Sequence, residues 1–360
     1  MAHLPSCPQC RRGSCPIHGR RGVRAPTRGL LRGMIGPVLT AGIATVAVVL
    51  LVDGAGEEPR QGAANVLLTH PDRVRAVAIS PDGRWLASGG YQGSVTLYDL
   101  TRKRIDTVLE GKPGALYGLA FSPDGALLAG ARLDGTVTLW ETKSWGVRRV
   151  FRADTGAIRS LAFSPDGSLL AAAGWDSTIG LWDPATWGAR SSLRGHHRAV
   201  TCVRSSPDGQ TLASTGADQT VRLWEVSSGR SGRIIRPRFG GVNQPTHCLA
   251  FSPDGQVLAS PGPQARLVLW DVSSGDETAT MGECEASVLS LTYSPDGRTL
   301  AAGTALGGVE LWVVASGRRR SVLRGHSGGI WGLVFAPDGQ ALFTGGDDGT
   351  VRVWDMSQPH

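Results

Sequence analysis

The 360-residue sequence has little that would mark an enzyme. It has no phosphate-binding loop of the Walker type, no HExxH pair for zinc and no pair of carboxylates at a distinctive spacing. The cysteines of the body, Cys202, Cys248 and Cys284, are scattered and do not have the pattern of a disulfide framework. These absences favour a protein that binds other molecules without transforming them.

Negative charge is missing from the N-terminal tail, and this decides how the net charge of +7 is interpreted. Residues 1–32 contain seven arginines and no acidic residue, so that 30 of the 37 basic residues remain to balance the 30 acidic residues. The body of the chain is therefore neutral, which argues against a nucleic-acid partner. Lysine is nearly absent beside arginine, a bias typical of a GC-rich bacterial genome.

The tail, residues 1–33, contains two C-x-x-C/H pairs. Their members are Cys7, Cys10, Cys15 and His18. Zinc takes four cysteine and histidine ligands tetrahedrally, so one interpretation is a small zinc site in the tail. The other interpretation is a basic tail in which the cysteines are incidental. No cofactor is expected elsewhere in the chain, and a small-molecule substrate is not expected.

An uncharged run of 19 residues, 34–52, follows the tail. A helix of this length spans about 30 Å, which is the hydrocarbon thickness of a bilayer. Arginines precede the run and acidic residues follow it, which predicts a single-pass protein of the cell membrane with a cytoplasmic N-terminus and an extracytoplasmic body. A cleaved signal peptide is the alternative, and a start at Met34 would remove the orientation signal. Residues 53–65 have the composition of a flexible linker.

From residue 66 to residue 358 the sequence repeats itself seven times. SPDG begins at residues 80, 122, 164, 206, 252 and 294, and APDG begins at residue 336. A second marker, Trp-Asp or a close variant of it, follows each copy in the same register. Short alternating apolar stretches separated by turns, with a period of about 42 residues, predict four strands per unit. The expected fold is an all-β, seven-bladed propeller.

These repeats resemble the WD-repeat (β-transducin-like) propeller family, in a membrane-anchored bacterial form. The Gly-His marker of that family stands at Gly195-His196 and Gly325-His326. The resemblance implies a hydrogen-bonded structural set inside each complete blade. The two complete sets are His196, Ser214, Asp218 and Trp224, and His326, Thr344, Asp348 and Trp354. Because a tryptophan is the fourth member and the sets recur at the blade spacing, we interpret them as structural and not as nucleophilic triads.

A partner-binding surface is predicted at one mouth of the propeller channel. Five residues before each SPDG or APDG, at the entry to the innermost strand, stand Arg75, Tyr117, Arg159, Thr201, His247, Leu289 and Trp331. Tyr91 and Trp175 precede turns where the resemblance places partner contacts. The one long unit adds a basic loop with Arg236, Arg238 and Phe239. Arginine, tyrosine and tryptophan dominate binding hot spots, so these side chains are the candidates for partner binding.

The leading functional prediction is a non-catalytic, membrane-anchored scaffold that binds a protein or peptide through one propeller face. An extracytoplasmic propeller enzyme of the hydrolase type is one alternative. A metal- or redox-responsive signalling protein, sensing through the Cys/His tail, is the other.

Overall fold

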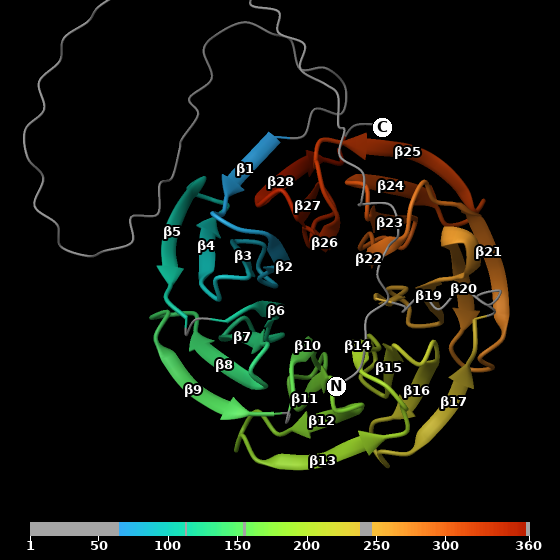
Figure 1. The fold of residues 1–360 in the computed structure, drawn as a ribbon, viewed down its shortest axis with the longest axis horizontal. Coiled ribbons are helices and arrows are strands. Elements are labelled where there is room, and N and C mark those ends of the chain that lie inside the picture. The colour runs from blue at the N-terminus through green and yellow to red at the C-terminus, as the bar shows by residue number, and fades with distance from the viewer. Residues whose placement is uncertain (1–64, 112–113, 154–155, 238–246, 358–360) are drawn as a thin grey trace, which may run out of the picture. The chain divides into compact units, whose positions relative to one another are not determined.

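The computed structural model describes residues 65–111, 114–153, 156–237 and 247–357. These residues form seven four-stranded antiparallel sheets that succeed one another as blades around a channel (Figure 1). The predicted all-β, seven-bladed propeller is confirmed. Strands and tight turns account for nearly all of it, and the 3-10 turn η1 (Pro263–Ala265) is the one helical element among the described residues.

The first four blades follow chain order from the inner strand to the outer strand. Blade 1 has β2 (Val74–Ile79), β3 (Trp85–Gly90), β4 (Val95–Asp99) and β5 (Arg104–Leu109). Blade 2 has β6 (Leu116–Phe121), β7 (Leu127–Arg132), β8 (Thr136–Glu141) and β9 (Val147–Arg152). Blade 3 has β10 (Ile158–Phe163), β11 (Leu170–Gly174), β12 (Thr178–Trp182) and β13 (Ala189–Arg194). Blade 4 has β14 (Val200–Ser205), β15 (Thr211–Gly216), β16 (Val221–Glu225) and β17 (Ser231–Ile235).

The last three blades complete the ring. Blade 5 has β18 (Ala250–Phe251), β19 (Val257–Pro261), β20 (Arg266–Asp271) and β21 (Glu277–Glu283). Blade 6 has β22 (Val288–Tyr293), β23 (Thr299–Thr304), β24 (Gly308–Val313) and β25 (Arg318–Arg324). Blade 7 has β26 (Ile330–Phe335), β27 (Ala341–Gly346), β28 (Thr350–Asp355) and, on the outside, β1 (Asn65–Thr69).

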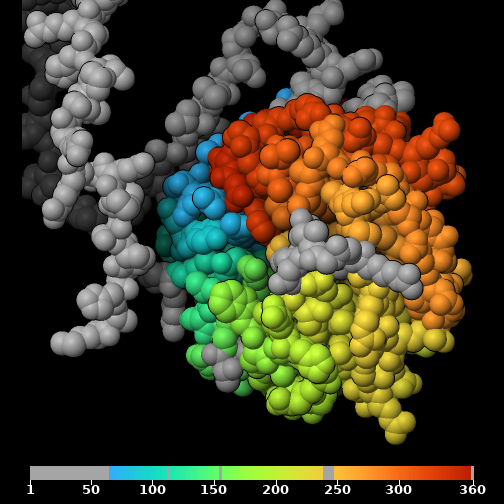
Figure 2. Space-filling model, turned by 45° about the vertical axis from the view of Figure 1, so that its right-hand side comes forward, coloured from blue at the N-terminus to red at the C-terminus, as the bar shows by residue number. Residues whose placement is uncertain are grey.

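Strand β1 closes the ring. It pairs antiparallel with β28, so that the first described strand belongs to the last blade. The two ends of the colour scale consequently adjoin on the surface (Figure 2). The register of β1 shifts between Val66 and Leu68, and this bulge places Leu68 opposite Val351. Leu323 stands opposite Val309, the equivalent residue of blade 6, so Leu68 fills the position that Leu323 fills there.

The SPDG motif builds the turn that follows each inner strand. In blade 2, Ser122 Oγ donates to Asp124 Oδ1 at 2.5 Å and accepts the backbone N–H of Leu127 at 2.9 Å. Asp124 Oδ1 also accepts the N–H of Ala126 at 3.0 Å. Gly125 has a φ of 68°, a left-handed conformation that favours glycine. One hydroxyl and one carboxylate thus accept the backbone N–H groups of Leu127 and Ala126, while the N–H of Gly125 donates to the Ser122 carbonyl at 2.8 Å.

The same turns also link each blade to the next. A Cβ built on the motif's glycine would lie against the motif's proline in the preceding blade, from 3.3 Å for Gly297 against Pro253 to 3.8 Å for Gly167 against Pro123. The contact recurs at all seven turns, including Gly83 against Pro337 across the closure. We call it the Pro–Gly ring. The recurrence of glycine itself follows from its φ, which lies between 68° and 73° at all seven turns.

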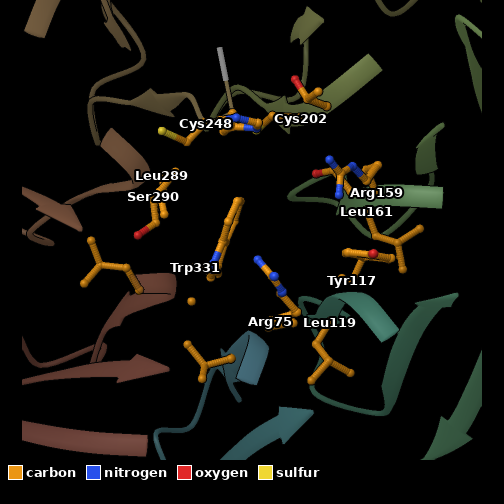
Figure 3. A pocket seen from close by; sticks show the side chains of 18 of the residues that line it. Arg75, Tyr117, Leu119, Arg159, Leu161, Cys202, Cys248, Leu289, Ser290 and Trp331 are labelled. Carbon is orange, nitrogen blue, oxygen red and sulfur yellow. The ribbon is translucent and has the colours of Figure 1, made fainter. Parts of the chain in front are cut away.

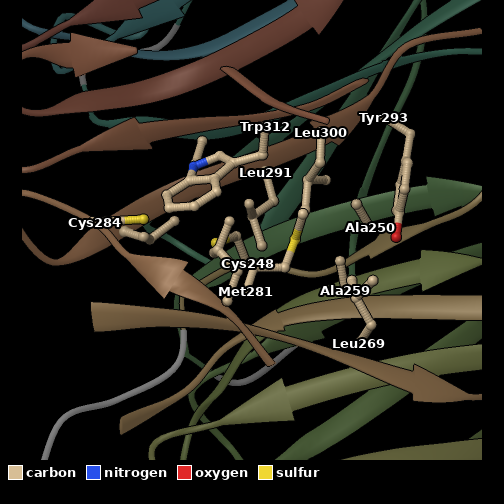
Figure 4. Close-up of a cluster of buried hydrophobic side chains, with 13 residues drawn as sticks. Cys248, Ala250, Ala259, Leu269, Met281, Cys284, Leu291, Tyr293, Leu300 and Trp312 are labelled. Atoms are coloured by element: carbon tan, nitrogen blue, oxygen red, sulfur yellow. The ribbon is translucent and has the colours of Figure 1, made fainter. Parts of the chain in front are cut away.

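The core lies between the blades, because both faces of each sheet are covered by neighbouring sheets. Figure 4 shows the cluster between blades 5 and 6, where Cys248 and Leu269 of one blade pack with Leu291, Leu300 and Trp312 of the other. Cys202, Cys248 and Cys284 are free thiols, and all three are buried. They contribute to the apolar packing of the core.

The predicted tail, membrane span and most of the linker lie outside the described residues, as do the zinc candidates Cys7, Cys10, Cys15 and His18. In the part of the chain that the structure describes, no helix has the length and apolar character needed to cross a membrane. These N-terminal features therefore stay predictions.

Candidate functional site

One end of the channel opens where the inner strands begin, and we call it the first mouth. A cavity of about 130 Å³ lies there, lined in part by Arg75, Tyr117, Arg159, Thr201, His247, Leu289 and Trp331. The seven residues that the sequence places at the strand entries thus come together around one opening. Figure 3 labels five of them, Arg75, Tyr117, Arg159, Leu289 and Trp331. Each blade contributes one of them because the repeat brings the same position to the same height.

Arg75 lies between two aromatic rings at the first mouth. Its guanidinium carbon is 4.1 Å from the ring centre of Trp331 and 5.0 Å from that of Tyr91, and Nη2 donates to the Tyr91 hydroxyl at 3.1 Å. Nη2 also lies 3.4 Å from Asp347 Oδ1. Trp331 Nε1 donates to Asp347 Oδ2 at 3.1 Å. Asp347 therefore orients both the arginine and the indole.

Arg159 continues this arrangement on the other side of the first mouth. Its guanidinium carbon is 4.9 Å from the ring centre of Tyr117 and 5.9 Å from that of Trp175. The rings of Tyr91 and Tyr117 meet edge to face at 6.1 Å, which joins the two arginine clusters. Burial lowers the pKa of Arg159, and among the described residues no carboxylate forms an ion pair with it. It is a partly desolvated cation at the entrance of a cavity.

His247 is neutral at pH 7. Burial, with smaller contributions from the charges of Arg159 and Arg75, lowers its pKa to about 4. Its ring meets that of Trp331 edge to face at 5.6 Å. His247 therefore offers a neutral hydrogen-bonding group beside two cations and does not add to their charge.

The remaining predicted binding residues divide into three groups. Tyr91 and Trp175 stand on the rim of the first mouth with 37% and 54% of their surface exposed. Arg236 is exposed but is not among the residues that line the cavity. Arg238 and Phe239 lie outside the described residues.

Asp347 is the functional residue that the sequence reasoning missed. It directly precedes Asp348, just as Tyr91 precedes Gln92 and Trp175 precedes Asp176. The column of residues that predicts Tyr91 and Trp175 therefore contains Asp347 as well. The prediction does not include Asp347, because an acidic side chain is not among the residue types that dominate binding hot spots.

The two predicted structural sets are each joined by hydrogen bonds. In blade 4, His196 Nε2 lies 2.7 Å from Ser214 Oγ and Nδ1 lies 3.0 Å from Asp218, while Trp224 Nε1 donates to Ser214 at 2.8 Å. In blade 7 the same contacts join His326, Thr344, Asp348 and Trp354. Ser214 and Thr344 are completely buried. A hydroxyl in that position cannot reach a substrate.

Blade 6 replaces this set with an ionic network, which the sequence reasoning also missed. Cys284 stands where blades 4 and 7 have histidine, and the fully buried Glu310 lies beside it. Glu310 accepts the backbone N–H of Glu285 at 2.7 Å and pairs with Arg319 Nη1 at 3.3 Å. Burial first, and then the carboxylate of Glu310, raises the pKa of the Cys284 thiol. The raised pKa keeps this thiol protonated at neutral pH.

The letters G-x-S-x-G occur at 325–329, between β25 and β26, and they do not form a nucleophile elbow. Such an elbow exposes its serine on a sharp turn from a strand into a helix, and these residues join two strands. The neighbouring His326 is held by Thr344 and Asp348. The backbone N–H of Ser327 donates to Asp348 at 3.1 Å, so these residues contribute to the hydrogen bonding of blade 7.

Comparison with known families agrees with this architecture. Residues 157–360 match the family described as "IFT122 first beta-propeller", and this match covers more than half of the chain. The chain belongs to that propeller family. Residues 64–99 and 103–141 match the family described as "WD domain, G-beta repeat". No curated protein matches the chain.

The repeat matches explain how this WD-repeat propeller closes. The matched segment 64–99 runs from β1 through β4, so one sequence repeat supplies the outer strand of one blade and three strands of the next. Every repeat is therefore shared between two neighbouring blades. WD-repeat and IFT122-type propellers are typically non-catalytic scaffolds.

Proposed function

We propose that this WD-repeat propeller is a non-catalytic scaffold that binds a protein or peptide partner at the first mouth. The arrangement that supports the proposal is the continuous chain of Arg75, Arg159 and the aromatic rings between and around them. Tyrosine, tryptophan and arginine bury a large contact area at a modest cost in side-chain entropy. Two exposed members, Tyr91 and Trp175, enlarge this surface beyond the cavity.

The charge of the first mouth favours an acidic segment in the partner. Arg75 is compensated by Asp347, whereas Arg159 has no carboxylate partner among the described residues. The buried Nε of Arg75 has no hydrogen-bond partner among the described residues either. A carboxylate entering the cavity would satisfy these donors, and charge-assisted hydrogen bonds are roughly twice as strong as neutral ones.

Selection of peptides from a random library on the purified chain tests this function. We expect acidic sequences, bound at least tenfold more weakly by Trp331→Ala, Tyr117→Ala and Arg159→Ala than by the unsubstituted chain. Val147→Ala is the matched control, because Val147 is 58% exposed on β9 at the outside of blade 2. Selected peptides that bind all variants equally would place the binding surface elsewhere.

The apolar run 34–52 supports the further proposal that the scaffold is anchored in the cell membrane, with a cytoplasmic tail and an extracytoplasmic propeller. Added protease should then cleave the propeller of intact cells while the tail stays protected. Protection of both segments until the cells are lysed would contradict this orientation.

The tail supports a separate proposal, a single zinc ion held by its Cys/His pairs. Metal analysis of the purified chain should give one zinc per chain, lost in a variant with Cys7→Ser and Cys10→Ser. Equal zinc content in both proteins would remove the proposed site, and the metal-responsive function with it.

A further inference from the structure

The first-mouth cavity is cationic, although the body of the chain is neutral. Arg75, Arg159 and Arg204 line it, and no acidic side chain is among the described residues of its lining. Asp347, outside the lining, is the only carboxylate that pairs with any of these three arginines in the described part of the chain. Arg159 and Arg204 thus add two positive charges that no described carboxylate compensates.

Arg75 and Arg159 act on the same space at the entrance. Burial first, and then the charge of Arg75, lowers the pKa of Arg159, and both arginines contribute to the lowered pKa of His247. Figure 3 shows Arg75 reaching toward the middle of the opening. Its side chain is only 8% exposed, and its buried Nε has no hydrogen-bond partner among the described residues. A buried cation with an unused donor costs free energy that a bound anion would offset.

Arg204 adds a third cation deeper in the channel, and it departs from the repeat. The equivalent residues of the other units are Ala78, Ala120, Ala162, Ala250, Thr292 and Val334, so the fold does not require an arginine there. Arg204 Nη1 donates to Ser160 Oγ at 3.2 Å, and Ser160 also lines the first-mouth cavity. Arg204 lies deeper than Arg159, because it lines the cavity at the opposite end of the channel, the second mouth, as well.

The hydroxyl groups of the lining are engaged with the protein itself. Three of them donate to backbone carbonyls, namely Ser160 to Val203 at 3.3 Å, Thr201 to Thr215 at 3.0 Å and Ser290 to Ile330 at 2.8 Å. The charged donors that remain for a ligand are guanidinium groups. The cavity therefore selects an anion.

The cavity accepts one chemical group and not a whole ligand. Its volume of about 130 Å³ is below the roughly 300–1,000 Å³ of pockets that enclose a small molecule. Tyr91, Leu133 and Trp175 directly follow β3, β7 and β11, and they are 37%, 42% and 54% exposed. The remainder of the ligand would thus meet an aromatic and apolar rim on three consecutive blades.

We propose that the partner presents a phosphorylated side chain, whose phosphoryl group enters the first-mouth cavity and accepts hydrogen bonds from Arg75 and Arg159. The peptide on either side of it lies on the rim. This inference rests on the proposed scaffold function and specifies the chemistry of the partner. A phosphate monoester has a charge of about −1.5 to −2 at pH 7, so it matches two uncompensated arginines, whereas a carboxylate matches one. The planar guanidinium also donates two parallel hydrogen bonds to a phosphate.

Binding of four matched peptide pools to the purified full-length chain tests the proposal. The pools share random flanking residues and have phosphoserine, phosphotyrosine, glutamate or serine at the centre. The tightest peptides are then synthesised with each central residue and titrated by fluorescence polarisation, with inorganic phosphate as a competitor.

Four variants divide the cavity from the rim. Arg159→Gln removes a cation at the entrance, and Arg204→Ala gives blade 4 the residue that four other units have, so that it should fold. Leu133→Ala changes the rim alone. Val147→Ala is the control, because Val147 is 58% exposed on β9 at the outside of blade 2.

We expect a phosphorylated pool to be enriched, and its best peptides to bind at least about tenfold more tightly than their glutamate counterparts. Arg159→Gln should weaken phosphopeptide binding roughly 10- to 100-fold, since hydrogen bonds to charged groups are the strong ones. Arg204→Ala should reduce the preference for phosphate over glutamate, because a dianion gains more than a monoanion from a nearby cation. Leu133→Ala should weaken both peptides by the same factor, and Val147→Ala should bind as the unsubstituted chain does.

Four results would each overturn the proposal. Equal affinity for phosphorylated and glutamate peptides would remove the phosphoryl site and leave the scaffold function standing. An unchanged preference in Arg159→Gln would place the phosphoryl group outside the first-mouth cavity. Inorganic phosphate that binds as tightly as any phosphopeptide would show that the cavity takes a free anion only. Absence of binding from all four pools would overturn the scaffold function together with this inference.

Discussion

Closure of the ring by β1 predicts that a single leucine near the start of the propeller matters as much as one in the middle. Leu68 is 6% exposed and packs with Val74, Leu86 and Tyr98 of blade 1 and with Phe343 and Val351 of blade 7. It therefore joins the first and last blades. Truncation of Leu68 to alanine removes methyl groups that contact both blades.

The expected cost of Leu68→Ala is about 2–4 kcal/mol, the lower part of the range for buried leucines because β1 is an edge strand. In a domain of this size each kcal/mol lowers the melting temperature by roughly 2–3 °C. The melting temperature should therefore fall by roughly 4–12 °C. Thermal unfolding followed by circular dichroism or calorimetry measures it.

Two matched variants make the result interpretable. Leu323→Ala removes the leucine that fills the same position in blade 6, where the outer strand β25 directly follows its partner β24 in the chain. Val66→Ala changes a residue of β1 that is 49% exposed, and it should have little effect. If Leu68→Ala resembles Val66→Ala and not Leu323→Ala, β1 does not contribute to closure and the reasoning fails.

Three further predictions concern stability. Gly297→Ala should lower the melting temperature more than Gly167→Ala. Both glycines have φ near 70°, but a Cβ would lie 3.3 Å from Pro253 in the first case and 3.8 Å from Pro123 in the second. Equal losses of melting temperature would show that the distance to the proline does not affect stability. The free energy of unfolding should fall as the pH is lowered from 6.5 to 4. Burial lowers the pKa of His70 from 6.5 to about 4, so over this range His70 becomes protonated in the unfolded chain and stays neutral in the folded chain. His70→Asn should reduce this fall, and an unchanged pH dependence of melting would exclude His70 as its source. Glu310→Ala should lower the free energy of unfolding by about 1–3 kcal/mol, because it leaves the backbone N–H of Glu285 without its acceptor. The control Glu283→Ala, on the exposed edge of β21, should leave stability unchanged. Similar melting temperatures for the two variants would contradict a stabilising role of the ionic network in blade 6.

The architecture was predictable because its signals are local and repeated. Each SPDG builds its turn from its own serine, aspartate and glycine, so six copies of it and one APDG, at a nearly constant spacing, predict seven similar hairpins. The first mouth was predictable for the same reason. A fixed distance from the turn places Arg75, Tyr117, Arg159 and Trp331 at one height of the ring.

Contacts between blades were not predictable, because they join residues that are distant in the chain and whose relative placement depends on closure. Asp347 orients Arg75 across the junction of the last and first blades, 272 positions away along the chain. Likewise, spacing from His70 alone would pair Leu67 with β28, and only the bulge in β1 brings Leu68 to that position.

By itself, then, the sequence determined the number of blades, the turns between their strands and the columns of residues that face each mouth, since these follow from periodicity. Only the tertiary structure decided what each exceptional residue does. It placed Asp347 of blade 7 beside Arg75 of blade 1, and it gave the Ser290 hydroxyl of blade 6 its acceptor, the Ile330 carbonyl of blade 7. The physical reason is that burial and hydrogen-bond partners arise from the neighbouring blades, which a residue meets only after the ring has closed.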